Sequence, residues 1–292
     1  MREPIGKNEI ISGYLELAKP RILSLVLVTT ALGFFLGGEG ISSGSLLLTL
    51  LAGSGLVCAG SSMLNHYLER DSDRLMVRTR NRPLPRGLIP GTNAMLLGII
   101  LILGGVFLLC WRVNLLTAFL SLLTAFLYVL VYTPMKKVSW LNTTIGAIPG
   151  ALPPMGGWAA ATGDLAPGAW ALFLILFAWQ HPHFYSIAWM FRDDYKRAGF
   201  KMLPVVYPDG KSMFRQINIF ALLLIPVSLL PTILGISGWI YFWGAIVLGT
   251  AMLWKGLVFS HSKTIPDARR LLRASVIYLP VLLFLIIFDA SF

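Results

Sequence analysis

Oxygen ligands and guanidinium groups are concentrated in one charged stretch, NHYLERDSDRLMVRTRNRPLPRG, residues 65–87. Within it, Asn65, Glu69 and Asp73 are spaced four residues apart, so a helix that continues through the stretch puts all three on one face. Amide and carboxylate oxygens, without softer ligands, suit a hard cation such as magnesium. The spacing therefore predicts a magnesium site formed by these three residues.

Two arginines follow at the same spacing, Arg78 and Arg82, before Pro83 ends any helix. Guanidinium groups match phosphate oxygens well. Carboxylates beside guanidinium groups can bind a magnesium-bridged diphosphate, because the metal cancels the repulsion between acids and phosphates while the arginines bind the remaining oxygens. The alternative is that the acids and bases only pair with each other on a solvated face.

A second charged stretch, FRDDYKRAGFK, again places acids beside bases and contains Asp193 and Asp194. It follows the sixth long apolar stretch of the chain, whereas the first charged stretch follows the second one. This arrangement suggests that the two acidic loops face each other over one mouth. Lys136 lies on the same side and is a further candidate for binding diphosphate, the alternative being a topological anchor.

Two histidines, His181 and His183, lie within the sixth apolar stretch, where an ionisable residue is a candidate for function. Imidazole can bind a metal or haem iron, or transfer protons. The alternative is a pair of core histidines with locally satisfied hydrogen bonds. Tyr185 and neighbouring aromatic residues either pack helices together or line an apolar tunnel for an isoprenoid chain and screen a carbocation.

The elements that must position these residues are membrane spans. Of the 292 residues, 56% are apolar and 13% are charged, and the mean hydropathy is +0.74, whereas soluble domains carry about a quarter charged residues. The composition excludes a soluble domain. We attribute the net charge of +11 to basic loop residues that set the membrane topology, and not to nucleic-acid binding. About nine stretches are long and apolar enough to span a bilayer. They cover residues 22–38, 45–66, 91–111, 115–133, 141–160, 168–190, 216–234, 239–258 and 272–289.

Basic residues give these spans a direction. All 24 Lys and Arg residues except Arg112 fall in the N-terminal segment or in loops on the same side of a nine-span arrangement. The positive-inside rule then places the N-terminus in the cytoplasm and the C-terminus outside. Because the N-terminal segment contains several Glu, it does not resemble an organelle leader, and we expect a bacterial plasma membrane protein.

The fifth span is unusual because it contains Pro149, Pro153, Pro154 and several glycines. Such a segment is expected to be buried among helices or to line a cavity, since a lipid-facing helix tolerates these residues poorly. No linker or low-complexity segment interrupts the chain. We therefore expect an all-α polytopic bundle around a central cavity, with residues 1–292 forming a single domain.

The order of the motifs resembles that of the UbiA-type intramembrane prenyltransferases. The first aspartate-rich motif of that family is similar to the pattern of Asn65, Glu69, Asp73, Arg78, Thr79, Arg82 and Pro83. Within the family, RTRNRPLPRG, YTPMKK, GAIPGALPPMGGW, WQHPHFYSIAW and DDYKRAGFKMLPVV resemble segments of the protohaem IX farnesyltransferases, or haem O synthases. The likeness runs from about Lys19 to the loop after the sixth span.

This resemblance implies nine transmembrane helices around a cavity, with magnesium bound between the two acidic loops. A second magnesium ion would be held by Asp193 or Asp194, and we favour Asp194. Many members of the family have Asp where this chain has Glu69, and because Glu keeps the charge but reaches further, the metal geometry is expected to differ. The second loop also departs from the D-x-x-x-D pattern of the wider family, because its two acids are adjacent.

The resemblance further implies a reaction. Farnesyl diphosphate would donate its farnesyl group to a vinyl group of haem B, with addition of water, to give haem O. The diphosphate would be bound by Arg78, Arg82 and Lys136, and the acceptor pocket would involve His181, His183 or Tyr185. A terminal oxidase or a further haem-modifying enzyme would receive the product.

Two alternatives stay open at this point. A related enzyme would keep the diphosphate chemistry and transfer the prenyl group to an aromatic quinone precursor or a chlorin. A transporter would use the broken fifth span and the intramembrane histidines as a substrate path. The transporter needs no magnesium and gives no reason for Asn65, Glu69 and Asp73 to share a helical face.

Overall fold

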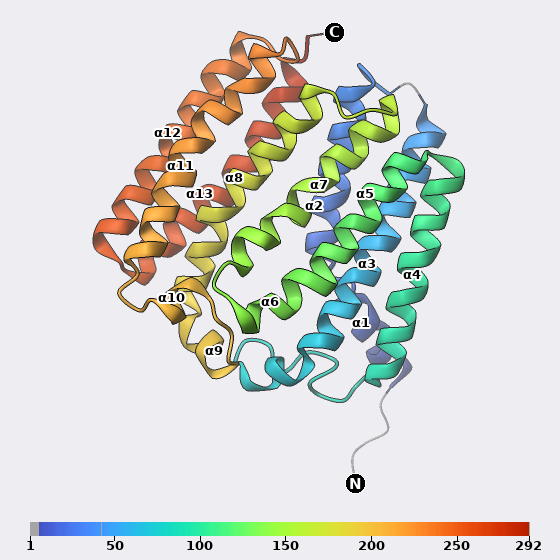
Figure 1. Ribbon diagram of the computed structural model, residues 1–292, viewed down its shortest axis with the longest axis vertical. Helices are drawn as coiled ribbons and strands as arrows, with labels where there is room; N and C mark the ends of the chain where they lie inside the picture. Colours follow the sequence, from blue (N-terminus) through green and yellow to red (C-terminus); the bar gives the residue numbers. More distant parts are fainter. Residues whose placement is uncertain (1–5, 42, 292) are drawn as a thin grey trace.

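The computed structural model describes residues 6–41 and 43–291, and its regular elements are helices. Arg2, one of the basic residues counted for the predicted topology, lies outside the described residues. The long helices form one bundle (Figure 1). They are α2 (Pro20–Gly37), α3 (Gly44–Leu75), α4 (Gly91–Arg112), α7 (Asn142–Thr162), α8 (Pro167–Met190), α11 (Lys211–Ile233), α12 (Trp239–Ser262) and α13 (Ile265–Phe288). A further continuous helical stretch joins α5 (Leu115–Phe126), the π-helical η1 (Leu127–Tyr132) and α6 (Thr133–Val138).

These elements match the predicted spans. Among the described residues, seven helical stretches are long and apolar enough to cross a membrane: α2, α3, α4, Leu115–Val138, α11, α12 and α13. The remaining two predicted spans are α7 and α8, which are also long and are largely buried in the bundle. Large apolar side chains such as Leu103, Phe107 and Trp243 are exposed on the outside, as expected for a surface in contact with lipid. The predicted all-helical polytopic fold is confirmed.

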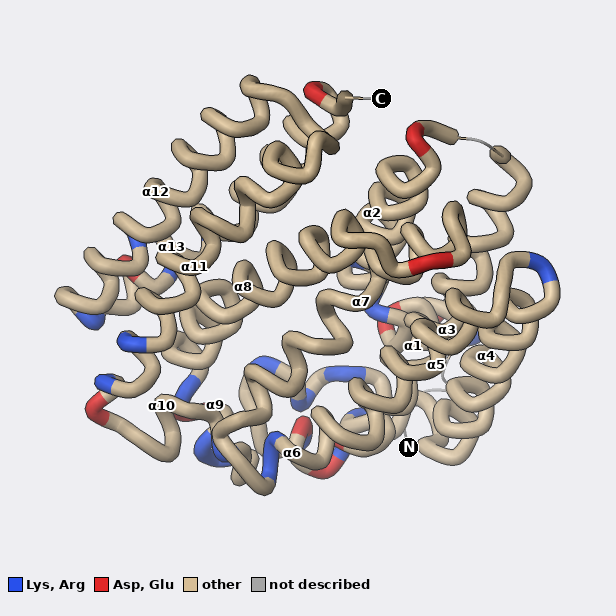
Figure 2. Tube along the Cα trace, turned by 45° about the horizontal axis from the view of Figure 1, so that its top comes forward, with Lys and Arg blue, Asp and Glu red and all other residues tan. Residues whose placement is uncertain are grey.

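Charged residues are concentrated at one end of this bundle. The short helices α1 (Lys7–Leu17), α9 (Arg192–Arg197) and α10 (Leu203–Val206) lie there, together with α6. Lys and Arg residues gather at the same end, whereas α13 finishes at the opposite end (Figures 1 and 2). Short helices and loops at this end therefore surround the residues that the sequence singles out.

The helix α3 continues beyond its apolar part. Ser43 Oγ accepts a hydrogen bond from Leu46 N–H and caps the start of the helix, which ends only at Leu75 before the extended backbone of Met76. Residues 67–75 include two Leu, two Arg and one Glu, which are good helix formers and support this extension. The extension carries the first acidic motif on an unbroken helix.

The proline-containing helix α7 is packed against α2 in the interior. A Cβ atom on Gly33 of α2 would collide with the carbonyl group of Pro154, and one on Gly157 of α7 would collide with that of Thr30. Glycine at both positions lets the two backbones approach closely. The fifth span is therefore buried, as predicted, and together with α2 it lines an interior cavity.

Candidate active site

A charged pocket lies at the end of the bundle where α3, α6 and the loop after α3 meet. Its wall contains Asn65, Glu69 and Asp73 from α3 and the three basic residues expected to bind phosphate, Arg78, Arg82 and Lys136. The rest of the wall is formed by Lys19, Met76, Tyr132, Tyr195, Phe200 and Met202. The structure thus brings the first acidic motif and the predicted phosphate ligands together in one place.

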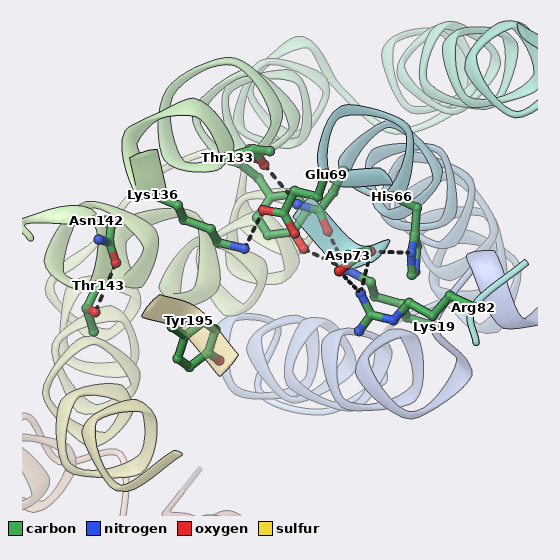
Figure 3. A network of polar contacts seen from close by, with 12 residues as sticks. Lys19, His66, Glu69, Asp73, Arg82, Thr133, Lys136, Asn142, Thr143 and Tyr195 are labelled. Carbon is green, nitrogen blue, oxygen red and sulfur yellow. Dashed lines mark hydrogen bonds and ion pairs between the residues drawn. The ribbon is translucent and has the colours of Figure 1, made fainter. Parts of the chain in front are cut away.

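Both acids of the α3 motif are paired with bases (Figure 3). Lys136 Nζ donates to Glu69 Oε1 at 2.6 Å, and Arg82 Nη1 donates to the two oxygens of Asp73 at 3.1 and 2.9 Å. Asp73 is completely buried, and Glu69 is 6% exposed. Because a buried carboxylate without a partner is costly, these pairs are what allow two acids to sit inside the protein.

Lys19 is a site residue that the sequence reasoning missed. Its Nζ donates to Asn65 Oδ1 at 2.6 Å and to the Tyr128 hydroxyl at 3.2 Å, while Asn65 Nδ2 donates to Thr133 Oγ1 at 3.0 Å. In the sequence, Lys19 counts only as one of the basic residues that set topology. Its position directly before the first span, at the end that carries the acids, is the signal that points to the site.

Aromatic side chains support the cations of the pocket. Lys136 Nζ lies 4.5 Å from the ring centroid of Tyr132 and 5.8 Å from that of Phe200. Arg78 lies against Tyr195 and donates to its hydroxyl at 3.4 Å. These aromatic faces stabilise the two cations through cation–π contacts. Tyr132 and Lys136 are four residues apart in one helical stretch, a spacing that the sequence shows, whereas the contacts with Phe200 and Tyr195 join segments far apart in the chain.

The structure places the second acidic pair outside the pocket. The side chain of Asp194 accepts hydrogen bonds from the backbone N–H groups of Val77 at 3.2 Å and Arg78 at 3.3 Å, and from the Arg197 guanidinium. Burial acts to raise the pKa of Asp194, but these three donors outweigh it and lower the pKa. Asp193 is exposed. Asp194 therefore connects α9 to the loop after α3, and neither acid lines the charged pocket.

This placement differs from the second metal site expected for Asp193 or Asp194. The physical reason is a break in the chain direction, since α8 ends at Met190 and α9 begins separately at Arg192. The break turns the two acids away, and Tyr195 occupies the wall of the pocket in their place. Within the described residues, no group of three or more His, Cys, Asp or Glu side chains is arranged to hold a metal ion.

The donor set of the α3 motif nevertheless fits magnesium in one particular form. Asn65, Glu69 and Asp73 provide one amide and two carboxylates, all hard oxygen donors, on one buried wall. Magnesium is usually bound through one or two carboxylates, with waters and substrate phosphates completing its ligands. The residues therefore suit magnesium that is shared with a diphosphate, and not a metal enclosed entirely by protein.

A larger apolar cavity of about 490 Å³ adjoins the charged pocket inside the bundle. Six residues line both spaces: Lys19, Arg78, Tyr132, Lys136, Tyr195 and Met202. Further inside, the walls are largely apolar and include Val26, Leu120, Leu152, Leu176 and Trp179. The two spaces together match a molecule that has an anionic head and a long apolar chain.

Of the three candidates for an acceptor pocket, His183 lines the apolar cavity, and His181 and Tyr185 do not. His181 is completely buried, with Nδ1 2.8 Å from the carbonyl oxygen of Phe177. Tyr185 is also completely buried and donates to Gln216 Oε1 at 2.5 Å. His181 and Tyr185 therefore hold helices together, and His183 is positioned to meet a ligand.

Comparison with known proteins identifies the family. Residues 26–283 match the UbiA prenyltransferase family. The chain belongs to this family. Curated relatives include the protoheme IX farnesyltransferases of Solibacter usitatus, 46% identical over 285 residues, and Salinibacter ruber, 49% identical over 277 residues. Each alignment covers 94% of this chain and 98% of the relative, which confirms the resemblance seen in the motifs. This UbiA protein is thus a prenyltransferase and a multi-pass membrane protein.

Solved structures share the fold of this UbiA protein. A structure of digeranylgeranylglyceryl phosphate synthase has a TM-score of 0.82 at 20% identity, and the match covers 96% of this chain and 98% of the other. A UbiA homologue from Archaeoglobus fulgidus bound to DMAPP and Mg2+ has a TM-score of 0.65 at 18% identity, with 94% and 98% covered. UbiA homologues thus bind magnesium together with prenyl diphosphates, and at these identities the likeness to this chain is one of fold.

Proposed function

We propose that the protein transfers a farnesyl group from farnesyl diphosphate to a vinyl group of haem B, with addition of water, to give haem O. The observation that carries this proposal is the junction between a charged pocket and an apolar cavity. A diphosphate fits the former and its isoprenoid chain the latter. The choice of farnesyl donor and haem acceptor follows from relatives of nearly equal length that are named protoheme IX farnesyltransferase.

Breaking of the allylic C–O bond is the first step of this reaction. The bonding electron pair leaves with the diphosphate, so negative charge grows on its oxygens. Arg78, Arg82, Lys136 and Lys19 line the pocket in which those oxygens would lie. Cations fixed in place before the reaction stabilise charge where it develops, without the cost of reorganising water.

The acids of the pocket have a complementary role. Asn65, Glu69 and Asp73 would hold magnesium, which when bound supplies a Lewis acid for the departing diphosphate. Lys136 and Arg82 now neutralise Glu69 and Asp73. With magnesium at the two carboxylates, these two bases would become available to phosphate oxygens.

Carbon–carbon bond formation follows in the apolar cavity. The vinyl π electrons of haem B attack C1 of the allylic cation, and the new cation beside the porphyrin ring takes up water and releases a proton. Exclusion of water from the cavity prevents early capture of the allylic cation. Trp179 and Tyr132 line the cavity, and aromatic rings near a carbocation stabilise its positive charge.

The charge distribution gives this enzyme an orientation. We infer that residues 1–292 act as one domain in the bacterial plasma membrane, with the mouth of the charged pocket in the cytoplasm. The basic residues that gather around this mouth support that orientation. Haem O would then pass to a terminal oxidase or to another haem-modifying enzyme.

The decisive experiment incubates purified protein with haem B, farnesyl diphosphate and magnesium, with and without a chelator, and measures the mass of the haem fraction. We expect a magnesium-dependent gain of one farnesyl group plus water. Unchanged haem, together with release of diphosphate when an aromatic quinone precursor or a chlorin is supplied, would keep the charged pocket and change the acceptor.

A further inference from the structure

His183 lines the apolar cavity, and one of its two ring nitrogens has no hydrogen-bond partner. Its Nδ1 lies 2.8 Å from the hydroxyl oxygen of Ser275 on α13. Ser275 has one hydroxyl proton and donates it to the Leu272 carbonyl at 2.7 Å. The hydroxyl therefore accepts a hydrogen bond from His183, so the ring proton is on Nδ1 and the lone pair is on Nε2.

That lone pair is free and the ring is held firmly. Within the described residues, the fully buried side-chain nitrogen and oxygen atoms without a hydrogen bond are both ring nitrogens of His66 and Trp158 Nε1. Nε2 of His183 also has no hydrogen bond but is not one of these atoms, so protein does not enclose it completely. The ring stacks on Trp179, with centroids 4.9 Å apart and planes inclined by 28°. Trp179 itself donates to the carbonyl oxygen of Ser275 at 2.8 Å. Ser275 thus orients the imidazole directly and through its stacking partner.

His181, two residues earlier, provides a contrast within the same helix. The Phe177 carbonyl can only accept, so His181 carries its proton on Nδ1, and its Nε2 accepts from Thr144 Oγ1 at 3.3 Å. The ring is stacked on Phe220 with centroids 3.5 Å apart and is completely buried. Both nitrogens of His181 are engaged, whereas His183 keeps one available.

We propose that Nε2 of His183 binds the iron of haem B and holds the acceptor in the apolar cavity. This inference rests on the proposed function, because it concerns how the same acceptor is held. Neutral imidazole is a common metal ligand, and a ligating histidine usually donates its other N–H to a fixed partner, as His183 does to Ser275. A proton-accepting role is less favourable, since a charged imidazolium loses its hydration in an apolar cavity.

Axial ligation explains how a flat, apolar acceptor is aligned for reaction. His183 lies about two helical turns before Met190, where α8 ends at the charged end of the bundle (Figure 1). Binding of the iron by His183 would fix the distance between the porphyrin and the charged pocket. The vinyl group that reacts is then determined by rotation of the porphyrin about the Fe–N bond, which the cavity walls limit.

The test titrates haem B into the purified full-length protein and follows the Soret band, with metal-free protoporphyrin IX as a matched ligand that lacks iron. We expect His183→Ala to lose the histidine-ligated Soret band, to lose the iron–histidine stretch in the resonance Raman spectrum, and to bind haem at least about tenfold more weakly. Its affinity for metal-free protoporphyrin should be unchanged. Ser275→Ala should keep the ligand but weaken haem binding by about tenfold.

Two control variants separate ligation from folding. His181→Gln changes the neighbouring buried histidine and should keep the histidine-ligated spectrum. His183→Met replaces nitrogen by sulfur as the ligand and should give a changed axial-ligand spectrum, which tests the assignment even where His183→Ala folds poorly.

Three outcomes decide the assignment. An unchanged Soret band and haem affinity in His183→Ala would overturn it, whatever the farnesyl transfer activity. A variant that retains the haem spectrum but forms a farnesylated product without the hydroxyl group would overturn it in favour of proton acceptance during water addition. Histidine-ligated haem in a wild-type protein that transfers no farnesyl group would support the ligand and overturn the proposed function.

Discussion

Two acidic clusters lie at the same end of the bundle and are used differently. Glu69 and Asp73 on α3 extend into the charged pocket and are paired with bases that also line it. Asp194 on α9 binds backbone N–H groups of the neighbouring loop, and Asp193 is exposed. In the sequence both clusters are acids beside bases that follow an apolar span. Sequence spacing predicts that acids converge on one pocket only where they lie on one unbroken helix, as Glu69 and Asp73 do on α3.

The strongest test of this contrast is Asp73→Asn. We expect turnover to fall by more than about a hundredfold, because the change removes a charge that fixes both Arg82 and the diphosphate-bound metal. The measurement is the initial rate of haem O formation at saturating magnesium, with metal-free protoporphyrin binding as the test of folding. A well-folded variant with near-normal turnover would show that α3 does not carry the metal site.

A second test removes the base that neutralises Asp73. Arg82→Ala should lower kcat/KM for farnesyl diphosphate by about ten- to a hundredfold, since a charge-assisted contact to phosphate is lost. Haem affinity should change much less, because the Arg82 side chain lies in the charged pocket and not in the apolar cavity. Comparable losses for both substrates would indicate that Arg82 acts through the structure of the loop.

A third test concerns the length of one acid. Glu69→Asp keeps the charge but shortens the reach that now brings Oε1 to 2.6 Å from Lys136. We expect a rate within about tenfold of the wild type with a shifted magnesium dependence, whereas Glu69→Gln, which removes the charge, should be affected more strongly. A magnesium titration of the initial rate distinguishes the two. Equal magnesium dependence in all three proteins would remove Glu69 from the proposed ligands.

Particular residues show how far the sequence could predict this site. Asn65, Glu69 and Asp73 are predictable because helical periodicity alone brings residues four apart onto one face. Lys19, Tyr132 and Tyr195 are not, because their places depend on how separate helices pack. The sequence also leaves His181 and His183 equivalent, and the difference between them depends on partners that lie 37 and 92 residues away along the chain.

The span count illustrates the same limit. Apolar length and loop charge predict the long helices, including the proline-containing α7. They do not predict that α8 ends at Met190 or that Asp194 of α9 then contacts the loop after α3, because that contact joins residues 117 apart in the chain. Hydropathy locates the spans, and the structure of the connections determines which charged residues enter the pocket.

The second cluster is expected to give smaller effects than the first. In Asp194→Ala the loop after α3 loses the acceptor for Val77 and Arg78 N–H, and we expect the rate to fall by no more than about tenfold, as for the loss of a hydrogen-bonded contact. Limited digestion with trypsin should cleave the arginine-rich loop faster than in the wild type. A loss as large as that of Asp73→Asn would instead make Asp194 part of the reaction.

Acidity should reproduce this effect in the wild type. Because the pKa of Asp194 is lowered in the folded protein, its contribution to stability is present above the ordinary carboxyl value of 3.8 and is lost as the pH falls through the lowered pKa. Trypsin is inactive in acid, so pepsin is used as the probe of the loop. Protection should persist at pH 4 and disappear only in stronger acid, and earlier loss would mean that other groups hold the loop.

The smallest effect is expected for Asp193→Asn, which is the matched control for Asp194. Asp193 is exposed and does not line the pocket, so the rate should stay within about twofold of the wild type, as is usual for a surface change. The same initial-rate assay provides the measurement. If Asp193→Asn were instead as inactive as Asp73→Asn, α9 would have to rotate on substrate binding and bring a second acid to the diphosphate. The two clusters would then share one role, and the contrast between them would describe only the state without substrate.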